Sequence, residues 1–403
     1  MKLTSCIKSY SADTQRAVPP EATLARIEKL LPVAGITRVA DITSLDRIGI
    51  PVFSSIRPLA GKGAVSVYNG KGATPAEAKV SAMMEGIERF SAEVQGQVLR
   101  VERFSRIAAE ETALDPADLI LPAGADPDSP IPWTAGYDLM NNEEIAVPAS
   151  AVFHPLPIEY FQLFRTSTNG LASGNTREEA VFHALMEVIE RDAWSLVEAS
   201  RDTGPVVQHV TDTLAVDLLG KFRGAGVDVT IRDITSDIGI PTVAAVSDDT
   251  LLKDPTLLTM GMGTHSSARI ALLRALTEVA QSRLTQIHGA REDTPVADIR
   301  KRMGYERTKR MNRYWYETET IREFSAIPSY DSSDFLDDIG MALRRLTDAG
   351  LDRVIVVDLT REALGVPVVR VIVPGLEMYA MDQERAGRRC HAARNRRVSR
   401  AKP

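Results

Sequence analysis

Three segments of the chain place acidic or amide side chains at the same helical spacing. In each, two alanines four residues apart are followed by an acidic residue and, three positions later, by a second acidic or amide residue. Helical residues three or four positions apart are neighbours, so each pair projects from one stripe of its helix. Carboxylates gathered in this way repel one another unless a cation lies between them. A hard divalent cation such as Mg²⁺ takes oxygen ligands and often accompanies phosphate, which suggests a nucleotide-using enzyme. The pairs are Glu85 and Glu88, Glu187 and Glu190, and Glu278 and Gln281.

The alternative is an ordinary solvated helix face, because a single Glu-x-x-Glu-Arg sequence is common on protein surfaces. The residues around the first two copies argue against it, since they leave little polar face on either helix. A helix that is apolar nearly all round is usually buried, and a buried carboxylate needs a compensating group. We therefore predict that the three helices share one acidic site. The flanking apolar residues are Val80, Met83, Met84 and Ile87 in the first copy and Val181, Leu185, Met186, Val188 and Ile189 in the second.

Composition limits the class of protein. The chain has 403 residues, 44% hydrophobic and 25% charged, which allows one large domain or two to three smaller ones. A net charge of −6 gives no general attraction to nucleic acid or to an anionic membrane. No apolar run approaches the roughly 18 residues of a membrane span, and the N-terminus lacks a signal-peptide pattern, so we expect a cytoplasmic protein. Two cysteines, Cys6 and Cys390, exclude a disulfide scaffold and a CxxC metal or redox motif.

The C-terminal stretch differs in composition from the rest of the chain. Residues 381–403 are strongly basic, and we expect them to form a flexible, solvated tail. Cys390 next to His391 resembles a thiol catalyst, but a flexible tail makes that role the weaker alternative. The basic residues are Arg385, Arg388, Arg389, Arg394, Arg396, Arg397, Arg400 and Lys402.

A second threefold pattern alternates with the acidic helices. A helix-like stretch is followed by a glycine, a β-branched run, an Asp-x-Thr turn and a second β-branched run. The glycine fits a left-handed helix cap, the paired runs fit strands, and Asp and Thr at the turn can bond their own backbone. The predicted fold is α+β (mixed α/β), with internally repeated helix–strand–strand units and one catalytic domain over residues 1–380. Residues 105–157 form an irregular excursion. The predicted helices are 21–31, 214–223 and 337–348, and the turns begin at Asp41, Asp233 and Asp358.

Glycine-containing turns precede the acidic helices. Thr74 with Glu77 and Thr176 with Glu179 each form a capping-box pattern, and Ser267 has the aligned position in the third copy. Such turns can also hold phosphate through free N–H groups and the helix dipole. Capping alone explains the turns at least as well, and no Walker or Gly-x-Gly-x-x-Gly motif is present. The carboxylates nearby favour the phosphate alternative.

Taken in this order, the motifs resemble those of the YcaO family. The chain contains that family's Ser-x3-Glu-x2-Glu-Arg signature from Ser81 to Arg89, its Ser-Thr-Asn-Gly-Leu-Ala-Ser-Gly-Asn segment from Ser167, and a third matching helix over 274–283. The resemblance extends from about Arg16 to Glu377 and implies the YcaO-type fold.

The resemblance implies an ATP site built from acidic helices, with Mg²⁺ as the metal. Members of the family use ATP to phosphorylate a backbone amide oxygen of a peptide, after which a nucleophile adds and phosphate leaves. Some members carry an additional Arg just after the Gln281 position, where this chain has only Arg283. The catalytic base is not indicated. By motif match, Glu85, Glu88, Glu187 and Glu190 would hold Mg²⁺, whereas Ser81, Asn175, Glu179, Gln281, Arg16, Arg89 and Arg191 would contact the nucleotide.

Branches of the family differ in the nucleophile. The segment 35–51 and the later 373–377 are similar to the TfuA-associated, methanogenesis-marker type, which implies peptide thioamidation and thioglycine in the alpha subunit of methyl-coenzyme M reductase. Two peripheral cysteines provide no sulfur relay, so sulfur is expected from external sulfide or a TfuA-type partner. Azoline-forming members use a Cys, Ser or Thr of the substrate and usually end in Pro-x-Pro-x-Pro, which this chain lacks. An ATP-binding accessory role, for example in ribosomal protein methylthiolation, is the third alternative. Members of the family often form homodimers.

Overall fold

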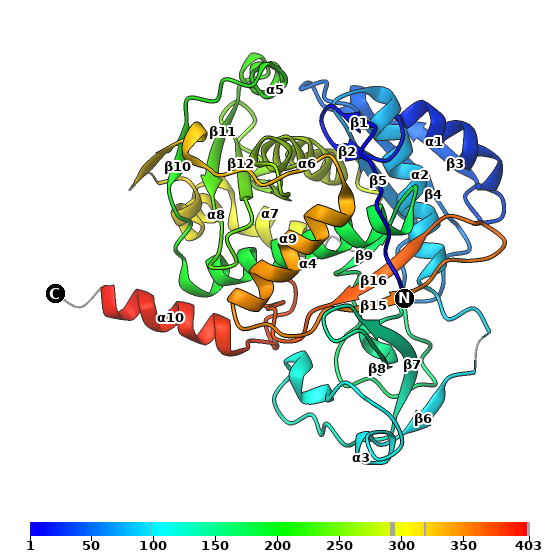
Figure 1. The fold of residues 1–403 in the computed structure, drawn as a ribbon. Coiled ribbons are helices and arrows are strands. Elements are labelled where there is room, and N and C mark those ends of the chain that lie inside the picture. The colour runs from blue at the N-terminus through cyan, green and yellow to red at the C-terminus, as the bar shows by residue number, and fades with distance from the viewer. Residues whose placement is uncertain (97, 291–294, 318–319, 401–403) are drawn as a thin grey trace.

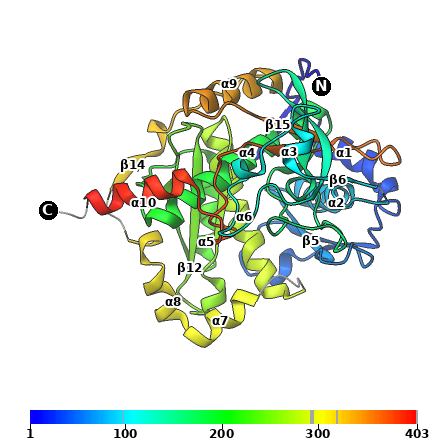
Figure 2. The ribbon, with the colours of Figure 1, turned by 90° about the horizontal axis from the view of Figure 1, so that it is seen from below.

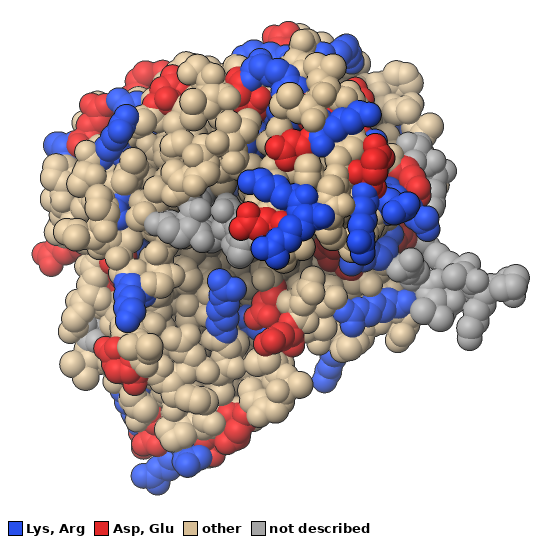
Figure 3. All heavy atoms as spheres, turned by 180° about the vertical axis from the view of Figure 1, so that it is seen from behind, with Lys and Arg blue, Asp and Glu red and all other residues tan. Residues whose placement is uncertain are grey.

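The computed structural model describes residues 1–96, 98–290, 295–317 and 320–400, and for residues 295–296 and 397–400 the backbone alone. Its mixture of helices and sheets confirms the predicted fold class (Figure 1). Among the described residues no helix is long and apolar enough to cross a membrane. On the face seen in Figure 3, basic and acidic side chains are interspersed. The helices are α1 (Pro20–Ile27), α2 (Pro75–Ser91), α3 (Phe104–Ile107), α4 (Arg177–Ser200), α5 (Thr213–Gly224), α6 (Ala268–His288), α7 (Pro295–Met303), α8 (Tyr305–Met311), α9 (Phe335–Asp348) and α10 (Arg388–Arg400).

Each acidic helix packs against its own sheet. Helix α2 covers the three-stranded sheet β3-β4-β5, α6 covers the sheet β13-β12-β11-β10-β14, and α4 packs on β16 and β9 of the sheet β6-β7-β15-β16-β9, in which β8 also pairs with β7. Figures 1 and 2 show α4 and α6 in the middle of the molecule and α2 beside them, among the N-terminal elements. The strands are β3 (Arg38–Asp41), β4 (Val52–Ile56), β5 (Val67–Lys71), β6 (Arg100–Glu102), β7 (Ile131–Asp138), β8 (Glu143–Pro148), β9 (Leu171–Ser173), β10 (Val206–Gln208), β11 (Val227–Asp233), β12 (Thr242–Asp249), β13 (Met260–Thr264), β14 (Ile321–Glu323), β15 (Ile355–Asp358) and β16 (Val368–Ile372), with β1 (Tyr10–Ser11) and β2 (Gln15–Arg16) forming a separate pair.

The predicted Asp-x-Thr turns recur with the same hydrogen bonds in all three units. The carboxylate of Asp41, at the first turn, accepts from the backbone N–H of Thr43 at 2.9 Å, and the Thr43 hydroxyl accepts from the N–H of Val52 at 3.1 Å. The same pair of bonds is formed at Asp233 and Asp358. The glycines that end the preceding helices have positive φ, as the caps require. These turns are structural, as predicted.

The third unit is divided along the chain. In the first two units the strands β5 and β13 follow their partners and lead directly into α2 and α6. The third unit consists of α9, β15 and β16 together with strand β9 and helix α4. In this unit β9 and α4 come before the other elements in the sequence. Strand β16 pairs with β9 from Val368 opposite Ser173, just as β4 pairs with β5 from Val52 opposite Lys71. The centre of the molecule is therefore assembled from segments nearly 200 residues apart.

Glycines in the strands allow the acidic helices to approach closely. A Cβ at Gly70 in β5 would overlap the backbone of Ala82 in α2, and one at Gly263 in β13 would overlap the backbone of Ala271 in α6. The alanines of the repeated motif lie on this sheet-facing side and are fully buried. Small residues on both partners thus set the distance between each helix and its sheet.

Two expectations about the rest of the chain differ from the structure. Residues 105–157 contain the β7–β8 hairpin, whose apolar residues pack in a core with β15 and β16, so the excursion is an ordered part of the sheet. The segment expected to be a flexible tail contains α10, which packs against α4; its last residues, 401–403, lie outside the described residues. Cys390 and Ala393 are buried at this contact, and Arg389 binds the fully buried Asp192 of α4 at 2.8 Å. Composition alone indicated a solvated segment because the apolar residues of α10 are few and small.

Candidate functional site

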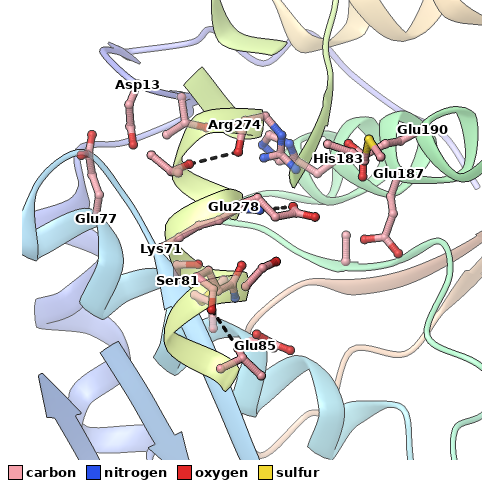
Figure 4. A pocket seen from close by; sticks show the side chains of 18 of the residues that line it. Asp13, Lys71, Glu77, Ser81, Glu85, His183, Glu187, Glu190, Arg274 and Glu278 are labelled. Carbon is pink, nitrogen blue, oxygen red and sulfur yellow. Dashed lines mark hydrogen bonds and ion pairs between the residues drawn. The ribbon is translucent and has the colours of Figure 1, made fainter. Parts of the chain in front are cut away.

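The eleven residues predicted for metal and nucleotide line one cavity. Its volume is about 740 Å³, and it is bounded by α2, α4 and α6 and by the N-terminal strand β2. Figure 4 shows carboxylates from all three helices facing this cavity. The eleven residues are Arg16, Ser81, Glu85, Glu88, Arg89, Asn175, Glu179, Glu187, Glu190, Arg191 and Gln281.

Helix capping positions the acidic helices at the cavity. Thr74 and Glu77 form the complete predicted capping box of α2. At α4 the Thr176 hydroxyl accepts from the N–H of Glu179 at 3.1 Å, but the Glu179 carboxylate does not return to the cap. At α6 Ser267 occupies the cap position without a side-chain hydrogen bond. The predicted capping box is therefore complete at the first helix and half formed at the second, and Ser267 takes its predicted cap position at the third.

The predicted nucleotide contacts at the start of α4 form one hydrogen-bonded chain. Glu179 accepts from the backbone N–H of Ala17 at 2.9 Å and from Arg16 at 3.4 Å. Asn175 donates to Glu179 at 3.1 Å and accepts from Thr23 of α1 at 2.8 Å. These contacts fix the N-terminal strand and α1 against α4, so the segment around Arg16 is held at the rim of the cavity.

The predicted metal ligands are anchored by backbone N–H groups. Ser173 N–H donates to Glu88 at 2.9 Å, Gly170 N–H donates to Glu187 at 3.2 Å, and Thr264 N–H donates to Glu190 at 3.0 Å. Glu88 and Glu190 are therefore each held by a strand of a neighbouring unit, whereas Glu187 is held by the loop before β9 of its own unit. Glu85 pairs with Arg89 of its own helix. This arrangement fixes the relative position of the three helices.

Burial makes several of these carboxylates hard to ionise. It raises the pKa of Glu88 to about 8, with a further contribution from the nearby Glu85 and Glu187, and it raises the pKa of Glu190. Arg89 lies at 3.1 Å from Glu85, and Arg191 lies at 3.8 Å from Glu190. A divalent cation in the cavity would favour the ionised carboxylates.

These residues fit both Mg²⁺ and phosphate groups. Carboxylate oxygens are the ligands that Mg²⁺ prefers, and Mg²⁺ usually keeps water or phosphate oxygens in its coordination sphere. Among the described residues no three His, Cys, Asp or Glu side chains converge closely enough to hold a metal ion by themselves, so Mg²⁺ here would also need water or phosphate oxygens. On the cationic side, Nε and Nη1 of Arg89 and Nε of Arg274 are buried without a hydrogen-bond partner. Guanidinium groups of this kind bind phosphate oxygens well.

Sequence reasoning missed several residues that line the cavity. Lys71, in the glycine turn before α2, forms an ion pair with Glu278. Burial alone would raise the pKa of Glu278, but Lys71 and Arg191 outweigh it and lower that pKa. The signal was present, because Glu278 has the aligned position of Glu85 and Glu187. Four residues before Glu85, Glu187 and Glu278, on the same face of each helix, the chain has Ser81, His183 and Arg274. All three line the cavity, but the sequence prediction included only Ser81.

Arg283 does not reach the cavity. Its side chain is fully buried, and it binds Asp46 at 2.8 Å and Asp249 at 3.0 Å. The basic residue near the Gln281 position is therefore a structural link between two sheets, which explains why it does not match the additional Arg of some family members.

The comparisons with known proteins identify the family. Residues 69–377 match the model for the YcaO cyclodehydratase, ATP- and Mg²⁺-binding. The chain therefore belongs to the YcaO family, and the predicted cofactors, ATP and Mg²⁺, are those of that family.

Individual relatives cover nearly the whole chain. An uncharacterized protein of Methanothermobacter thermautotrophicus is 53% identical over 385 residues, which is 94% of this chain and 99% of that protein. An uncharacterized protein in the tfuA 3′ region of Rhizobium leguminosarum bv. trifolii is 35% identical, covering 90% of this chain and 89% of that protein. The solved structure of YcaO from Methanopyrus kandleri bound with AMPPCP and Mg²⁺ is 33% identical, with a TM-score of 0.81, and covers 95% of this chain and 98% of that chain.

Proposed function

We propose that this protein uses ATP and Mg²⁺ to convert a backbone amide of a peptide into a thioamide. The amide oxygen takes the γ-phosphoryl group of ATP, a sulfur nucleophile adds to the activated carbon, and phosphate leaves with the former amide oxygen. The proposal depends mainly on one observation. Carboxylates from three helices, and guanidinium groups with unpaired N–H donors, line the same large cavity. Mg²⁺ would neutralise the negative charge on the oxygens of the phosphoryl group that is transferred.

The protein's own residues would orient and neutralise the reacting groups. Glu85, Glu88, Glu187 and Glu190 would hold Mg²⁺, and backbone N–H groups keep the last three in place before ligands bind. Arg89 and Arg274 have free N–H groups for phosphate oxygens. The contacts among Arg16, Asn175 and Glu179 would close the cavity around the remaining part of the nucleotide.

The positions of the cysteines bear on the source of the sulfur. Neither cysteine lines the cavity: Cys390 is fully buried where α10 packs against α4, and the Cys6 Sγ lies 3.2 Å from the Thr176 hydroxyl. A sulfur atom would therefore come from outside the chain, as sulfide or from a TfuA-type partner. The similarity to a protein of a methanogen and to one from a tfuA region favours this branch, with the alpha subunit of methyl-coenzyme M reductase as the first substrate to test.

The test is intact-mass analysis of a glycine-containing peptide from that subunit after incubation with the protein, ATP, Mg²⁺ and sulfide. Replacement of one oxygen by sulfur, with one phosphate released per event, is the expected result. The matched control omits sulfide. A mass loss of one water from a Cys- or Ser-containing peptide would replace the proposal with azoline formation, the activity named in the family description. ATP binding with no peptide change would favour the accessory role.

A further inference from the structure

A second, smaller cavity lies beside the large one. Its volume is about 50 Å³, and its wall includes Arg370 of β16, Ser150 and Asn169. Since roughly 10–15 Å³ holds one water molecule, the space admits a few water-sized species and nothing as large as a nucleotide. One backbone segment separates the two cavities: Asn169 lines the small one, Leu171 lines the large one, and the N–H of Gly170 between them binds Glu187.

The polar groups of this small cavity are buried and have no partners. Nε and Nη1 of Arg370, Oγ of Ser150 and Oδ1 of Asn169 all lack a hydrogen bond among the described residues. The Arg370 side chain is only 4% exposed. Several unsatisfied groups around one space indicate that something fills it, because buried polar groups are nearly always bonded.

The charge of the small cavity is positive. Arg385, which is 5% exposed, also lines it and donates to the carbonyl groups of Leu119 and Ile120 rather than to a carboxylate. Burial lowers the pKa of Arg370 to about 10, against the opposing influence of the Glu187 and Glu88 charges, and no carboxylate among the described residues accepts a hydrogen bond from it. Asp118 is the one acidic side chain among the described residues of this wall, and it is exposed to solvent. Water would satisfy the hydrogen bonds without adding charge, whereas an anion would also pair directly with the Arg370 guanidinium, which Glu187 and Glu88 do not.

The donor and acceptor pattern narrows the choice of anion. Arg370 and the Ser150 hydroxyl offer donors, whereas Asn169 Oδ1 offers an acceptor. A halide could accept from the donors but would leave the acceptor unpaired. Hydrosulfide accepts through its charged sulfur and donates through its single S–H, so it satisfies both kinds of group.

We propose that the small cavity lined by Arg370, Ser150 and Asn169 binds hydrosulfide and holds it next to the reaction cavity. This inference rests on the thioamidation proposed above. The hydrosulfide sulfur would form the new C–S bond at the phosphorylated amide carbon. The C–O bond would then break, phosphate would leave with the electron pair, and the S–H proton would be lost to the medium. The net reaction consumes ATP and hydrosulfide and yields the thioamide, ADP and phosphate.

Direct binding tests the anion site independently of activity. Crystals of the full chain soaked in sodium bromide, measured at the bromine absorption edge, are expected to show bromide within hydrogen-bonding distance of Arg370. The same soak of Arg370→Gln should show none there, whereas Arg100→Gln, a matched control on the exposed part of the same sheet, should keep it. Bromide retained in Arg370→Gln would overturn the site, and so would the absence of any anion at Arg370 when crystals of the unmodified protein are soaked in sodium hydrosulfide.

Kinetics then test the identity of the anion. In Arg370→Gln the KM for sulfide should rise about tenfold or more, because a charge-assisted hydrogen bond is lost, while the KM for ATP and kcat at saturating sulfide stay unchanged. An equal rise in the KM for ATP would instead make Arg370 a structural support of the large cavity. Competition by added phosphate that disappears in the variant would assign the site to phosphate and overturn hydrosulfide.

The two proposals can fail separately. Bromide at Arg370 in a protein that thioamidates no peptide would leave the anion site standing and sink the proposed function. Thioamidation with an unchanged sulfide KM in Arg370→Gln would leave the function standing and sink this inference. The melting temperature of Arg370→Gln, expected to equal or exceed that of the unmodified protein because an unpaired buried charge is removed, verifies folding in both cases.

Discussion

At the scale of single residues, Glu187 and Glu190 combine burial, backbone anchoring and a position on the cavity wall. Replacing either with Gln keeps the shape but removes a negative charge from the proposed Mg²⁺ site. We expect Glu187→Gln and Glu190→Gln to lower ATP turnover by about 100-fold or more, with an unchanged circular dichroism spectrum. Glu178→Gln is the control, because Glu178 is on the same helix but does not line the cavity. Normal phosphate release from both variants would refute the metal assignment.

Asp13 gives the protein a pH-dependent stability. Burial, with a further contribution from Glu77, raises the pKa of Asp13 to about 8, from the ordinary value of 3.8. Between these two values the folded state holds a proton that the unfolded state has released, so stability falls as pH rises, by at most about 1.4 kcal/mol per pH unit. Asparagine imitates the protonated carboxyl and can still accept the 2.8 Å hydrogen bond from Ala73 N–H.

The Asp13→Asn variant should therefore lose part of this pH dependence. We expect its melting temperature to fall less between pH 5 and pH 8 than that of the unmodified protein. Differential scanning calorimetry of both proteins, free of nucleotide and metal, measures the difference. Parallel melting curves across this range would show that Asp13 ionises at its ordinary pKa.

At the scale of the elements, the distance between α2 and its sheet depends on Gly70. A methyl group there would overlap the backbone of Ala82, so Gly70→Ala must push α2 and its carboxylates away from β5. We expect a loss of about 1–3 kcal/mol or more in the free energy of unfolding, together with weaker ATP turnover. Gly220→Ala, at a helix position with open space around it, is the control and should stabilise the protein by about 0.5–1 kcal/mol. Urea unfolding of the two variants makes the comparison, and equal stability would contradict the close packing.

The contact between α10 and α4 depends on Arg389. This side chain binds both oxygens of Asp192, which is fully buried, and also reaches Asp237. Arg389→Gln leaves the Asp192 carboxylate without its cation, and we expect a loss of about 3 kcal/mol in the free energy of unfolding. Arg396→Gln, on the exposed side of the same helix, should change little. Similar unfolding curves for the two variants would restore the interpretation of this segment as a solvated tail.

Local patterns were sufficient for the elements and much of the site. Helical spacing located the acidic stripe, and β-branched runs flanking Asp41, Asp233 and Asp358 located the paired strands, because both signals depend on neighbours in the sequence. The ordering of α10 could not be predicted in this way, since it depends on a buried aspartate nearly 200 residues away. The ion pair of Lys71 with Glu278 also joins residues far apart in the sequence, so local patterns could not predict it. For the same reason they could not predict that Nε and Nη1 of Arg370 are buried without a hydrogen-bond partner. The similarity of Glu278 to Glu85 placed it on the shared acidic stripe, but the assignment of metal ligands and nucleotide contacts did not include it.

At the scale of the whole molecule, we propose that the chain up to and including α10 acts as one catalytic unit. Its cavity is shared by helices from three sheets, so a ligand there links all three. ATP and Mg²⁺ together should therefore stabilise the entire protein, by about 2.7 kcal/mol at 100 times the dissociation constant, and either one alone should stabilise it much less.

The melting temperature with and without each ligand measures this coupling. EDTA added to the ternary mixture should return the melting temperature to near that of ATP alone. The Glu187→Gln variant serves as the control, because it should show little additional stabilisation from Mg²⁺. Equal stabilisation by ATP with and without Mg²⁺ would show that the nucleotide binds independently of the carboxylates.

The division of the third unit along the chain has a consequence for synthesis on the ribosome. Strands β15 and β16 are made more than 150 residues after β9 and α4, yet they form the sheet on which α4 rests. The units of α2 and α6 are each complete soon after their own helix is made, whereas α4 must wait until residue 372 has left the ribosome. A nascent chain arrested before that point holds two finished walls of the cavity and an uncovered apolar helix. The capacity to bind nucleotide is thus acquired only after β16 has been made.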